Sequence, residues 1–293
     1  MIEMIHSGRT WTLVLSWLAM VLPTAQGAET RLVTVGGAAT EIVFALGAGD
    51  QVVAVDTSST YPESVRQLPQ VGYVRNLSPE GVLSMAPDLV IATGAVGPPA
   101  ARKLLERVDV PLLWLPDPVG FADLRQSIRM VAARLERESA GDELLKTIKA
   151  QLATARERAK AFGSDRPRVL FLLEPPGPGA GGMAGGRDSR AAALVELAGG
   201  RNAVEDFSGF QPVSRESLLS INPDVIFIGR SSAHGGGAGA AKSLLEDTTL
   251  AGVAAVQRDA VFEVPLSDLA FGTRLGEAVL RWNSYLTEAI KTD

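Results

Sequence analysis

A fifteen-residue stretch of this chain recurs, without a gap, 136 residues further along. The first copy, residues 77–91, reads LSPEGVLSMAPDLVI, and the second, residues 213–227, reads VSRESLLSINPDVIF. Six of the fifteen positions are identical. Each copy has a polar helix start, a helical pattern, a proline stop and then an apolar strand. The repeated unit therefore predicts two lobes of similar build with a cleft between them.

The two copies differ in what precedes them. Tyr73 lies four residues ahead of the first copy, and the same offset from the second copy falls on Gly209. One lobe therefore has an aromatic hydroxyl where the other has no side chain. We interpret this as two lobes of similar build, of which only the first carries a functional side chain at this position.

Apolar, β-branched runs alternate with helical patterns along most of the chain. Strands are expected at 31–35, 52–55, 88–93, 112–115, 168–173, 224–228 and 261–264. Helices are expected at 40–46, 79–86, 98–108, 189–197 and 276–291, and a Pro/Gly-rich loop at 175–186. Such alternation is typical of parallel βα units.

The region after the fourth strand is helical for much longer. It is interpreted as a helix near 121–137 and a second one at 140–162, divided at Gly141. At 1.5 Å per residue the second helix would be roughly 30 Å long, enough to join two lobes as a rod. The predicted fold class is α/β, with two parallel-sheet α/β lobes (29–139 and 163–293) joined by a long inter-lobe helix, and a ligand cleft between them. The alternative is an ordinary surface helix within one domain.

Residues 1–28 are interpreted as a signal peptide. Residues 11–22 form an apolar or small-polar run that Pro23 ends, and small residues suited to cleavage follow. The run is short for a permanent membrane span, although an N-terminal anchor is the alternative. The chain contains no cysteine, so neither a lipid-bearing cysteine nor a disulfide is expected. These features together predict a soluble protein of a bacterial periplasm.

The composition argues against several classes of function. A net charge of −5 without runs of Lys or Arg disfavours nucleic acids and anionic membranes as partners. After the signal segment the chain has one histidine, His234, so neither a zinc site nor a Ser-His-Asp triad is expected. The sequence also lacks a P-loop, a nucleophile elbow and a dinucleotide-binding fingerprint. An enzyme is therefore not predicted. A periplasmic hydrolase using paired carboxylates and an interaction module without a ligand are the alternatives.

Several stretches resemble one family. The opening RLVTVGGAATEIVFALG at 31–47 and the long central helix are similar to periplasmic substrate-binding proteins of the helix-linked class, which serves importers of haem, siderophores and cobalamin. VGYVRNLSPEG at 71–81 resembles the haem-binding branch, whose motif carries a tyrosine that ligates haem iron. MAGGRD at 183–188 and AFGTR at 270–274 are also similar to that branch. A siderophore or cobalamin carrier is the alternative within the class.

The resemblance implies a monomer that takes haem from an outer-membrane receptor and passes it to an ABC importer. It makes Tyr73 the axial ligand of the haem iron, and tyrosinate oxygen does serve as such a ligand. Because free tyrosine has a pKa of about 10, a neighbouring cation would favour the ionised form. Arg75 is a candidate for the same cleft or for the propionates, Arg230 for the tyrosine oxygen, and Arg274 for a propionate. Tyr73 as a plain wall aromatic, the arginines as surface charges, and Tyr61 as a substitute ligand are the alternatives.

The expected stoichiometry is one haem. Some members of the family take two stacked haems and use a histidine in the loop after the first strand of the second lobe. Here that loop reads EPPGPGAGG at 174–182 and has no histidine. His234 is the weaker alternative for a second ligand.

The repeated glutamates have a separate implied role. In this class a glutamate on each lobe docks onto arginines of the membrane permease, and Glu80 and Glu216 match those positions. A carboxylate at the same turn of two similar helices suits a pseudo-symmetric partner such as a permease dimer. The alternative is that each glutamate only complements its helix dipole, an effect of under about 1 kcal/mol.

Overall fold

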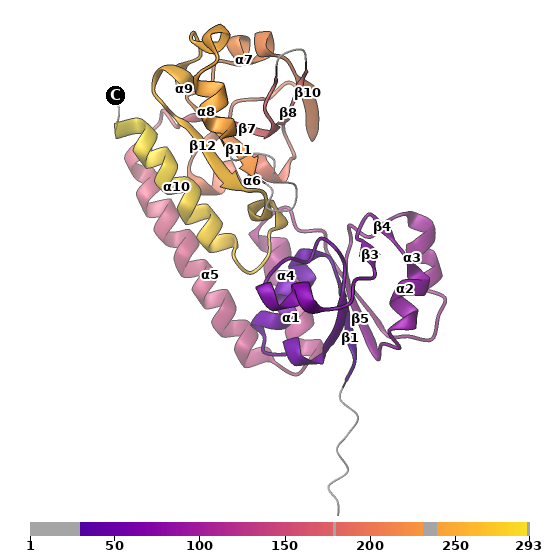
Figure 1. Cartoon of the computed structure of the whole chain (residues 1–293). Helices are drawn as coiled ribbons and strands as arrows, with labels where there is room; N and C mark the ends of the chain where they lie inside the picture. Colours follow the sequence, from indigo (N-terminus) through magenta and orange to yellow (C-terminus); the bar gives the residue numbers. More distant parts are fainter. Residues whose placement is uncertain (1–29, 178–179, 231–238, 292–293) are drawn as a thin grey trace, which may run out of the picture.

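The computed structural model describes residues 30–177, 180–230 and 239–291 as two α/β lobes, each built on its own sheet (Figure 1). The expected signal peptide at 1–28 and His234 lie outside the described residues. In the part of the chain that is described, no helix combines the length and the apolar character needed to cross a membrane.

The N-terminal sheet has four parallel strands in the order β2-β1-β5-β6. Their bounds are Val52–Val55 for β2, Leu32–Val35 for β1, Leu89–Thr93 for β5 and Leu112–Leu115 for β6. The two central strands are buried at every residue, because helices cover both faces of the sheet. α1 (Gly37–Ala45) and α4 (Phe121–Arg134) pack on one face, and α2 (Pro79–Ser84) and α3 (Pro99–Leu105) on the other.

Four short elements complete this lobe. β3 (Gly72–Tyr73) and β4 (Asn76–Leu77) form a small antiparallel hairpin, and η1 (Gly49–Gln51) and η2 (Glu63–Gln67) are single 3₁₀ turns. The hairpin carries Tyr73 above the carboxyl ends of the sheet strands, because Gly72 and Val74 are both hydrogen-bonded to loops that follow those strands.

The C-terminal sheet has a parallel centre and an antiparallel edge. β7 (Arg168–Glu174), β11 (Val225–Arg230) and β12 (Val261–Pro265) run parallel, and the two-residue β9 (Arg201–Asn202) pairs with the start of β7. β8 (Gly182–Gly185) and β10 (Phe210–Val213) extend the sheet as antiparallel strands. The helices and turns of this lobe are α6 (Arg190–Ala198), α7 (Arg215–Ile221), α8 (Ala240–Leu245), η4 (Thr248–Leu250), α9 (Ala254–Gln257), η5 (Leu266–Ala270) and α10 (Leu275–Lys291).

The α/β class predicted from the sequence is confirmed, but the expected loop at 175–186 is wrong in part. β8 lies inside it, formed by residues that have no β-branched side chain. The strand exists because its backbone pairs with β7 and β10, and because small residues allow a close approach. A Cβ at Gly182 would lie 2.6 Å from the carbonyl oxygen of Glu174.

Both copies of the repeat fold as an N-capped helix that leads into a sheet strand. The Ser78 hydroxyl accepts from the Gly81 N–H at 3.0 Å, and the Ser214 hydroxyl accepts from the Ser217 N–H at 3.2 Å. The helices end where the chain takes a left-handed conformation, at Ala86 in the first copy (φ +46°). The repeated helix and strand predicted from the sequence are confirmed.

The repeated Pro-Asp pair has a structural role that the sequence did not reveal. The Asp88 carboxylate accepts from the backbone N–H of Arg31, and the Asp224 carboxylate from that of Arg168, both at 2.8 Å. Each arginine side chain in turn donates to carbonyl oxygens at the end of the repeated helix. In each lobe the repeat therefore ties its helix to the start of the lobe's first strand.

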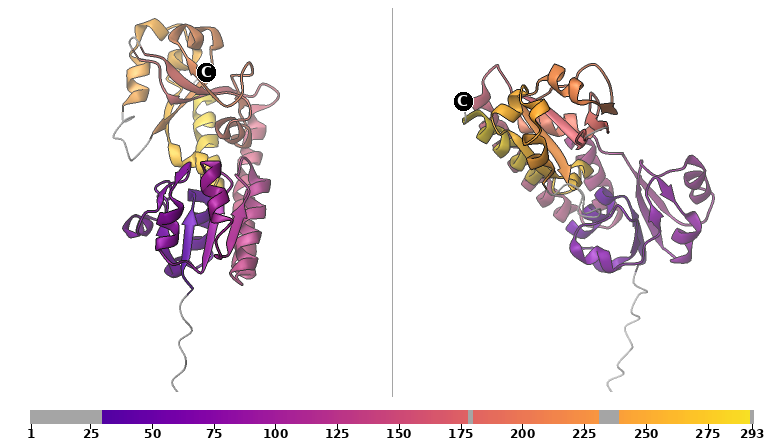
Figure 2. Two further views of the ribbon diagram at one scale, coloured as in Figure 1. Left: turned by 90° about the vertical axis from the view of Figure 1, so that its right-hand side faces the viewer. Right: turned by 45° about the horizontal axis from the view of Figure 1, so that its top comes forward.

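A long helix spans from one lobe to the other. α5 (Glu138–Ala159), extended by η3 (Lys160–Phe162), packs on α4 in the N-terminal lobe and on α6 and α10 in the C-terminal lobe. Its 22 residues give a length of about 33 Å. Figures 1 and 2 show α5 and α10 along one side of the molecule, where they link the two lobes.

The expected break at Gly141 is wrong. The preceding helix ends before Glu136, which has φ +55°, and Gly141 lies inside α5. A Cβ at Gly141 would come 2.9 Å from the Cβ of Ala132, so glycine allows α4 and α5 to pack closely.

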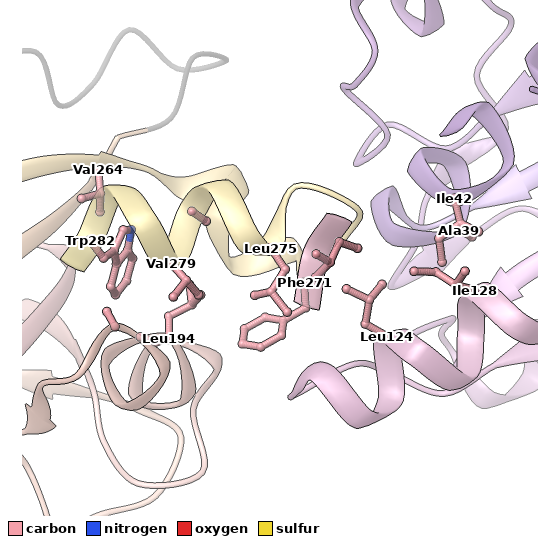
Figure 3. Close-up of a cluster of buried hydrophobic side chains, with 14 of the residues drawn as sticks. Ala39, Ile42, Leu124, Ile128, Leu194, Val264, Phe271, Leu275, Val279 and Trp282 are labelled. Carbon is pink, nitrogen blue, oxygen red and sulfur yellow. The ribbon is translucent and has the colours of Figure 1, made fainter. Parts of the chain in front are cut away.

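The largest cluster of buried side chains is continuous between the lobes (Figure 3). Ile128 of α4 lies beside Ala39 of α1, Leu124 of α4 lies toward Phe271 and Leu275, and the cluster continues along α10 to Trp282. The Trp282 ring in turn lies 4.8 Å from that of Phe227 in the C-terminal sheet. A shared core of this kind favours a limited range of lobe movement.

Candidate ligand-binding site

Two adjoining cavities lie where the lobes meet. Their volumes are about 700 Å³ and 160 Å³, and the larger is of the size typical of small-molecule sites. Both are lined by residues from both lobes. The lining residues that they share are Gly37, Ser58, Tyr73, Arg190 and Ala270.

The cavities lie at the carboxyl ends of the parallel strands. Gly36 follows β1, Ser58 follows β2 and Asp117 follows β6 in the N-terminal lobe, while Arg230 ends β11 in the other lobe. Ligands of open α/β sheets bind at this edge, where loops and helix starts converge. Another hollow of about 760 Å³ lies in the C-terminal lobe alone, beside α8. The cleft between the lobes is therefore the better candidate site.

Tyr73 lines both cavities, and its side chain is 47% exposed. Its hairpin is held from two sides, because Thr57 donates its N–H to the Gly72 carbonyl at 2.8 Å and Gly97 donates to the Val74 carbonyl at 2.9 Å. Gly72 has φ +105°, a conformation that favours glycine. The backbone is thus fixed while the phenol faces open space.

Gly209, the counterpart of Tyr73 by sequence offset, lies in the turn before β10. It is not among the described residues that line either cavity. Its backbone bonds to Gly186 and Arg187 instead, at 2.7 Å each. The asymmetry between the two copies of the repeat is therefore present at the site.

Two of the arginines singled out in the sequence lie at the cavities. Arg75 is exposed and lines the smaller cavity, and Arg230 is exposed and lines the larger one from the opposite lobe. Tyr73 lines both cavities, so the cleft that it faces has one of these two arginines on its wall from each lobe.

Arg274 lines the larger cavity but is already paired. Its Nη2 donates to Glu41 Oε1 at 2.7 Å, and its guanidinium lies over the ring of Tyr61, 4.1 Å from the centroid. Burial lowers the pKa of Arg274, but the hydrogen bond and charge of Glu41 outweigh it and hold the pKa above its ordinary value. The Glu41 carboxylate, on α1 of the other lobe, also accepts from the Thr273 hydroxyl at 3.1 Å. Arg274 is therefore part of an inter-lobe ion pair.

Tyr61, the substitute ligand considered from the sequence, faces a neighbouring hollow with Arg274. It is not among the described residues that line the two cavities of the cleft. Its ring supports the Arg274 guanidinium, which is a structural role.

A fully buried carboxylate, Asp56, organises one wall of the site. It accepts from the Gly36 N–H at 2.7 Å, from the Ser58 N–H at 2.9 Å and from the Ser59 hydroxyl at 2.7 Å. These bonds fix the start of α1 and the turn after β2. Sequence reasoning missed Asp56, although its place directly after a strand of a parallel sheet is a usable signal.

Arg190 is the second residue that sequence reasoning missed. It is the first residue of α6, directly after the N-cap Ser189, and it lines both cavities. Its Nη2 forms an ion pair with Asp117 of the other lobe, and its Nη1 lies 3.5 Å from the Leu269 carbonyl oxygen. Its place just beyond the MAGGRD stretch was the available signal.

Glu80 and Glu216 are exposed in the first turns of α2 and α7. Figures 1 and 2 show these two helices in different lobes, on the side away from α5 and α10. The hydrogen bond from Ser214, followed by the backbone bond of Glu216 itself, lowers the pKa of Glu216 below its ordinary value. The carboxylate therefore stays charged at neutral pH. Over the described residues, no cluster of three or more His, Cys, Asp or Glu side chains is placed to hold a metal ion.

Two α/β lobes, a spanning helix and a cavity between the carboxyl ends of both sheets define a two-lobed binding protein. The comparisons with known proteins agree: residues 32–266 match the model of the periplasmic binding protein family, and the chain belongs to that family. The resemblance seen in the sequence is thereby confirmed.

A solved structure of the periplasmic heme-binding protein BhuT, in complex with two hemes, is similar, with a TM-score of 0.80 and 33% identity. The match covers 89% of this chain and 98% of that one. The vitamin B12-binding protein of Yersinia pestis (strain Pestoides F) is 27% identical over 71% of this chain and 72% of its own length.

An uncharacterized ABC transporter substrate-binding lipoprotein of Bacillus subtilis (strain 168), YvrC, is 31% identical over 67% of this chain. The chain spans 62% of the length of that relative. The family and these relatives identify the chain as a substrate-binding protein and not an enzyme.

Proposed function

We propose that this chain binds one haem in the cleft between its lobes, with Tyr73 on the iron, and delivers it to an ABC importer. The lobes of residues 29–139 and 163–293 are the two walls of the site, and the helix region 140–162 holds them together. The single observation that carries the proposal is the placement of Tyr73, half-exposed and shared by both cavities of the cleft.

The surroundings of Tyr73 suit a ferric haem. Ferric iron takes tyrosinate as an axial ligand. Arg75 and Arg230 line the cleft from opposite lobes, and their guanidinium groups are suited to the two propionates or to the phenolate oxygen. The similarity to a heme-binding protein at 33% identity supports haem as the ligand class. Arg274 contributes indirectly, because its guanidinium is already paired with Glu41.

The second candidate stoichiometry is two haems, because the similar structure of BhuT holds two. One haem is the better fit to this chain, since the loop at 174–182 has no histidine in its sequence and Tyr73 is the one tyrosine among the described residues that line the two cavities. His234, the alternative second ligand, lies outside the described residues.

Hemin titration of the purified protein tests the ligand and the stoichiometry together. We expect a Soret band that saturates at one equivalent and a charge-transfer band typical of tyrosinate. The chain has three tyrosines, so Tyr73→Phe has two matched controls, Tyr61→Phe and Tyr285→Phe. Tyr73→Phe removes only the oxygen, and we expect it to lose the tyrosinate band and to weaken binding by at least about tenfold. We expect the two control variants to keep the tyrosinate band and the wild-type hemin affinity. An unchanged spectrum in Tyr73→Phe refutes the assignment.

Cobalamin is the second candidate ligand, because a vitamin B12-binding protein is among the relatives. Competition separates the two ligands. We expect excess cyanocobalamin to leave the hemin titration unchanged. A saturable rise in Tm with cyanocobalamin alone would contradict the haem proposal.

Delivery places the protein in a periplasm, acting as a monomer between an outer-membrane haem receptor and a permease dimer. Glu80 and Glu216 are the proposed contacts to permease arginines. Glu80→Lys combined with Glu216→Lys is expected to abolish haem uptake while the hemin affinity of the purified protein stays the same. Retained uptake supports the alternative, in which the two carboxylates only complement their helix dipoles.

A further inference from the structure

Arg190 holds a central position in the cleft that the proposed function does not yet use. It comes from the C-terminal lobe, lines both cavities, and its side chain is 26% exposed. Its ion-pair partner, Asp117, comes from the N-terminal lobe and is 42% exposed. The pair therefore crosses the cleft within reach of solvent, at the place where the two cavities adjoin.

The guanidinium of Arg190 is only partly engaged. Among the described residues its acceptors are Asp117, through Nη2, and the Leu269 carbonyl oxygen, at 3.5 Å from Nη1. A guanidinium presents five N–H donors in a planar fork that matches a carboxylate. A ligand carboxylate in the cleft could therefore accept from the N–H groups of Arg190 that now donate to the exposed Asp117.

The second inter-lobe ion pair provides a contrast. Glu41 is almost fully buried, with its side chain 3% exposed, and it also accepts from Thr273. Displacing Arg274 would leave a buried charge without its partner, which is costly. Displacing Asp117 returns an exposed carboxylate to water, so exchange of partners at Arg190 costs far less. Of the two pairs, only Asp117–Arg190 is suited to open when a ligand enters.

We propose that Arg190 is a carboxylate-binding residue of the cleft, and that Asp117 is an internal anion that occupies it until a ligand carboxylate takes its place. The inference rests on the proposed function, in which the carboxylates are the haem propionates. Ligand entry then breaks one inter-lobe ion pair and leaves the Glu41–Arg274 pair intact. Ligand binding thereby changes the number of ion pairs that connect the two lobes.

The two partners predict effects of opposite sign. Arg190→Gln removes the donor fork, and we expect hemin binding to weaken roughly tenfold, the scale of one charge-assisted hydrogen bond. Asp117→Asn removes the competing anion and leaves Arg190 in place, so we expect hemin binding to tighten about threefold. If the pair were only a structural link between lobes, both substitutions would change the affinity in the same direction.

Hemin dimethyl ester, whose propionates carry no charge, isolates the carboxylate contribution. Neither variant is expected to change the affinity for the ester. Arg201→Gln, an exposed arginine on β9 at the opposite end of the sheet strands, is the matched control and should leave both affinities unchanged. Thermal unfolding of each variant without ligand checks that it is folded.

The outcomes distinguish this inference from the proposed function. Opposite shifts with hemin and none with the ester support the role of Arg190. The wild-type protein can bind hemin while the two variants change the hemin affinity in the same direction, or change the affinities for hemin and for the ester equally. Either result overturns the role of Arg190 and leaves the haem proposal standing. Failure of the wild-type protein to bind hemin overturns both.

Discussion

Replacing Arg274 with alanine is expected to cost much more stability than neutralising its partner Glu41. The Glu41 side chain is 3% exposed and that of Arg274 is 26% exposed. In Arg274→Ala the buried carboxylate keeps its charge and retains one partner, the Thr273 hydroxyl at 3.1 Å. Breaking a buried ion pair from one side costs about 3–5 kcal/mol, and the partial exposure of Arg274 places this case near the lower limit, about 3 kcal/mol.

The reverse substitution, Glu41→Gln, leaves no buried charge. The arginine is partly hydrated and rests on the Tyr61 ring, and the amide oxygen of glutamine can still accept its hydrogen bond. We expect a loss of about 1 kcal/mol. The double variant, Glu41→Gln with Arg274→Ala, should be more stable than Arg274→Ala alone, because the isolated charge is then gone.

Thermal unfolding of the ligand-free protein, followed by circular dichroism, measures these differences. A loss of about 3 kcal/mol corresponds to a fall in Tm of roughly 6–12 °C for a chain of this size. Lys146→Ala is the control, because its ion pair with Glu143 is exposed and should be worth less than about 0.5 kcal/mol. Equal losses for Arg274→Ala and Glu41→Gln, or a double variant no better than Arg274→Ala, would refute the reasoning from a buried charge.

Three further predictions follow from local geometry. Gly141→Ala gains about 1 kcal/mol of helix propensity but forces a contact with Ala132, so we expect the free energy of unfolding to fall by about 1 kcal/mol in total. A higher Tm for this variant would contradict the close packing of α4 on α5. Ser214→Ala should move the pKa of Glu216 upward, toward its ordinary value of 4.5, in a carbon-13 NMR titration. Because the pKa of Glu216 is lowered in the folded protein, the charged carboxylate stabilises the fold at a pH above the pKa of the unfolded state, and this stabilisation is lost as the pH falls through the pKa of the folded state. An unchanged titration midpoint in Ser214→Ala would exclude the Ser214 hydrogen bond as the cause of the lowered pKa. Asp56→Ala leaves the N–H groups of the cleft wall unsatisfied and should lower stability by about 3 kcal/mol and weaken hemin binding; full retention of both, in urea unfolding and hemin titration, would deny Asp56 its organising role.

Elements specified by local signals were predicted closely from the sequence. The strands expected at 52–55 and 112–115 have those bounds in the structure, and the polar helix start expected in each copy of the repeat is an N-cap, Ser78 in the first and Ser214 in the second. N-caps and β-branched runs act through neighbouring residues, so a single sequence is enough to read them.

Elements specified by distant contacts were predicted poorly. Gly141 was interpreted as a helix break, yet its small size serves the packing against Ala132, and the chain turns at Glu136 instead. The strand Gly182–Gly185 has no strand-forming residues and is held by its pairing with β7 and β10. Glycine allows both a turn and a close approach, and only the tertiary structure shows which is used.

The candidate site divides in the same way. Tyr73, Arg75 and Arg230 were singled out from the sequence, and the structure brings them to adjoining cavities of one cleft. The ion pairs that cross that cleft were not foreseen, because they join residues 73 and 233 positions apart along the chain. Arg274, the third arginine singled out, also lines the larger cavity, and the structure adds that it is paired with Glu41.

The sequence by itself determined the two-lobed α/β plan, the caps of the repeated helices and the one-sided placement of a tyrosine before the first repeat. Those features depend on periodicity and on residues within a few positions of each other. Only the tertiary structure decided which charges meet across the cleft, with Glu41 buried against Arg274 and Asp117 exposed beside Arg190. The physical reason is that burial and ion pairing depend on which distant segments the fold brings together, and the local sequence does not specify those contacts.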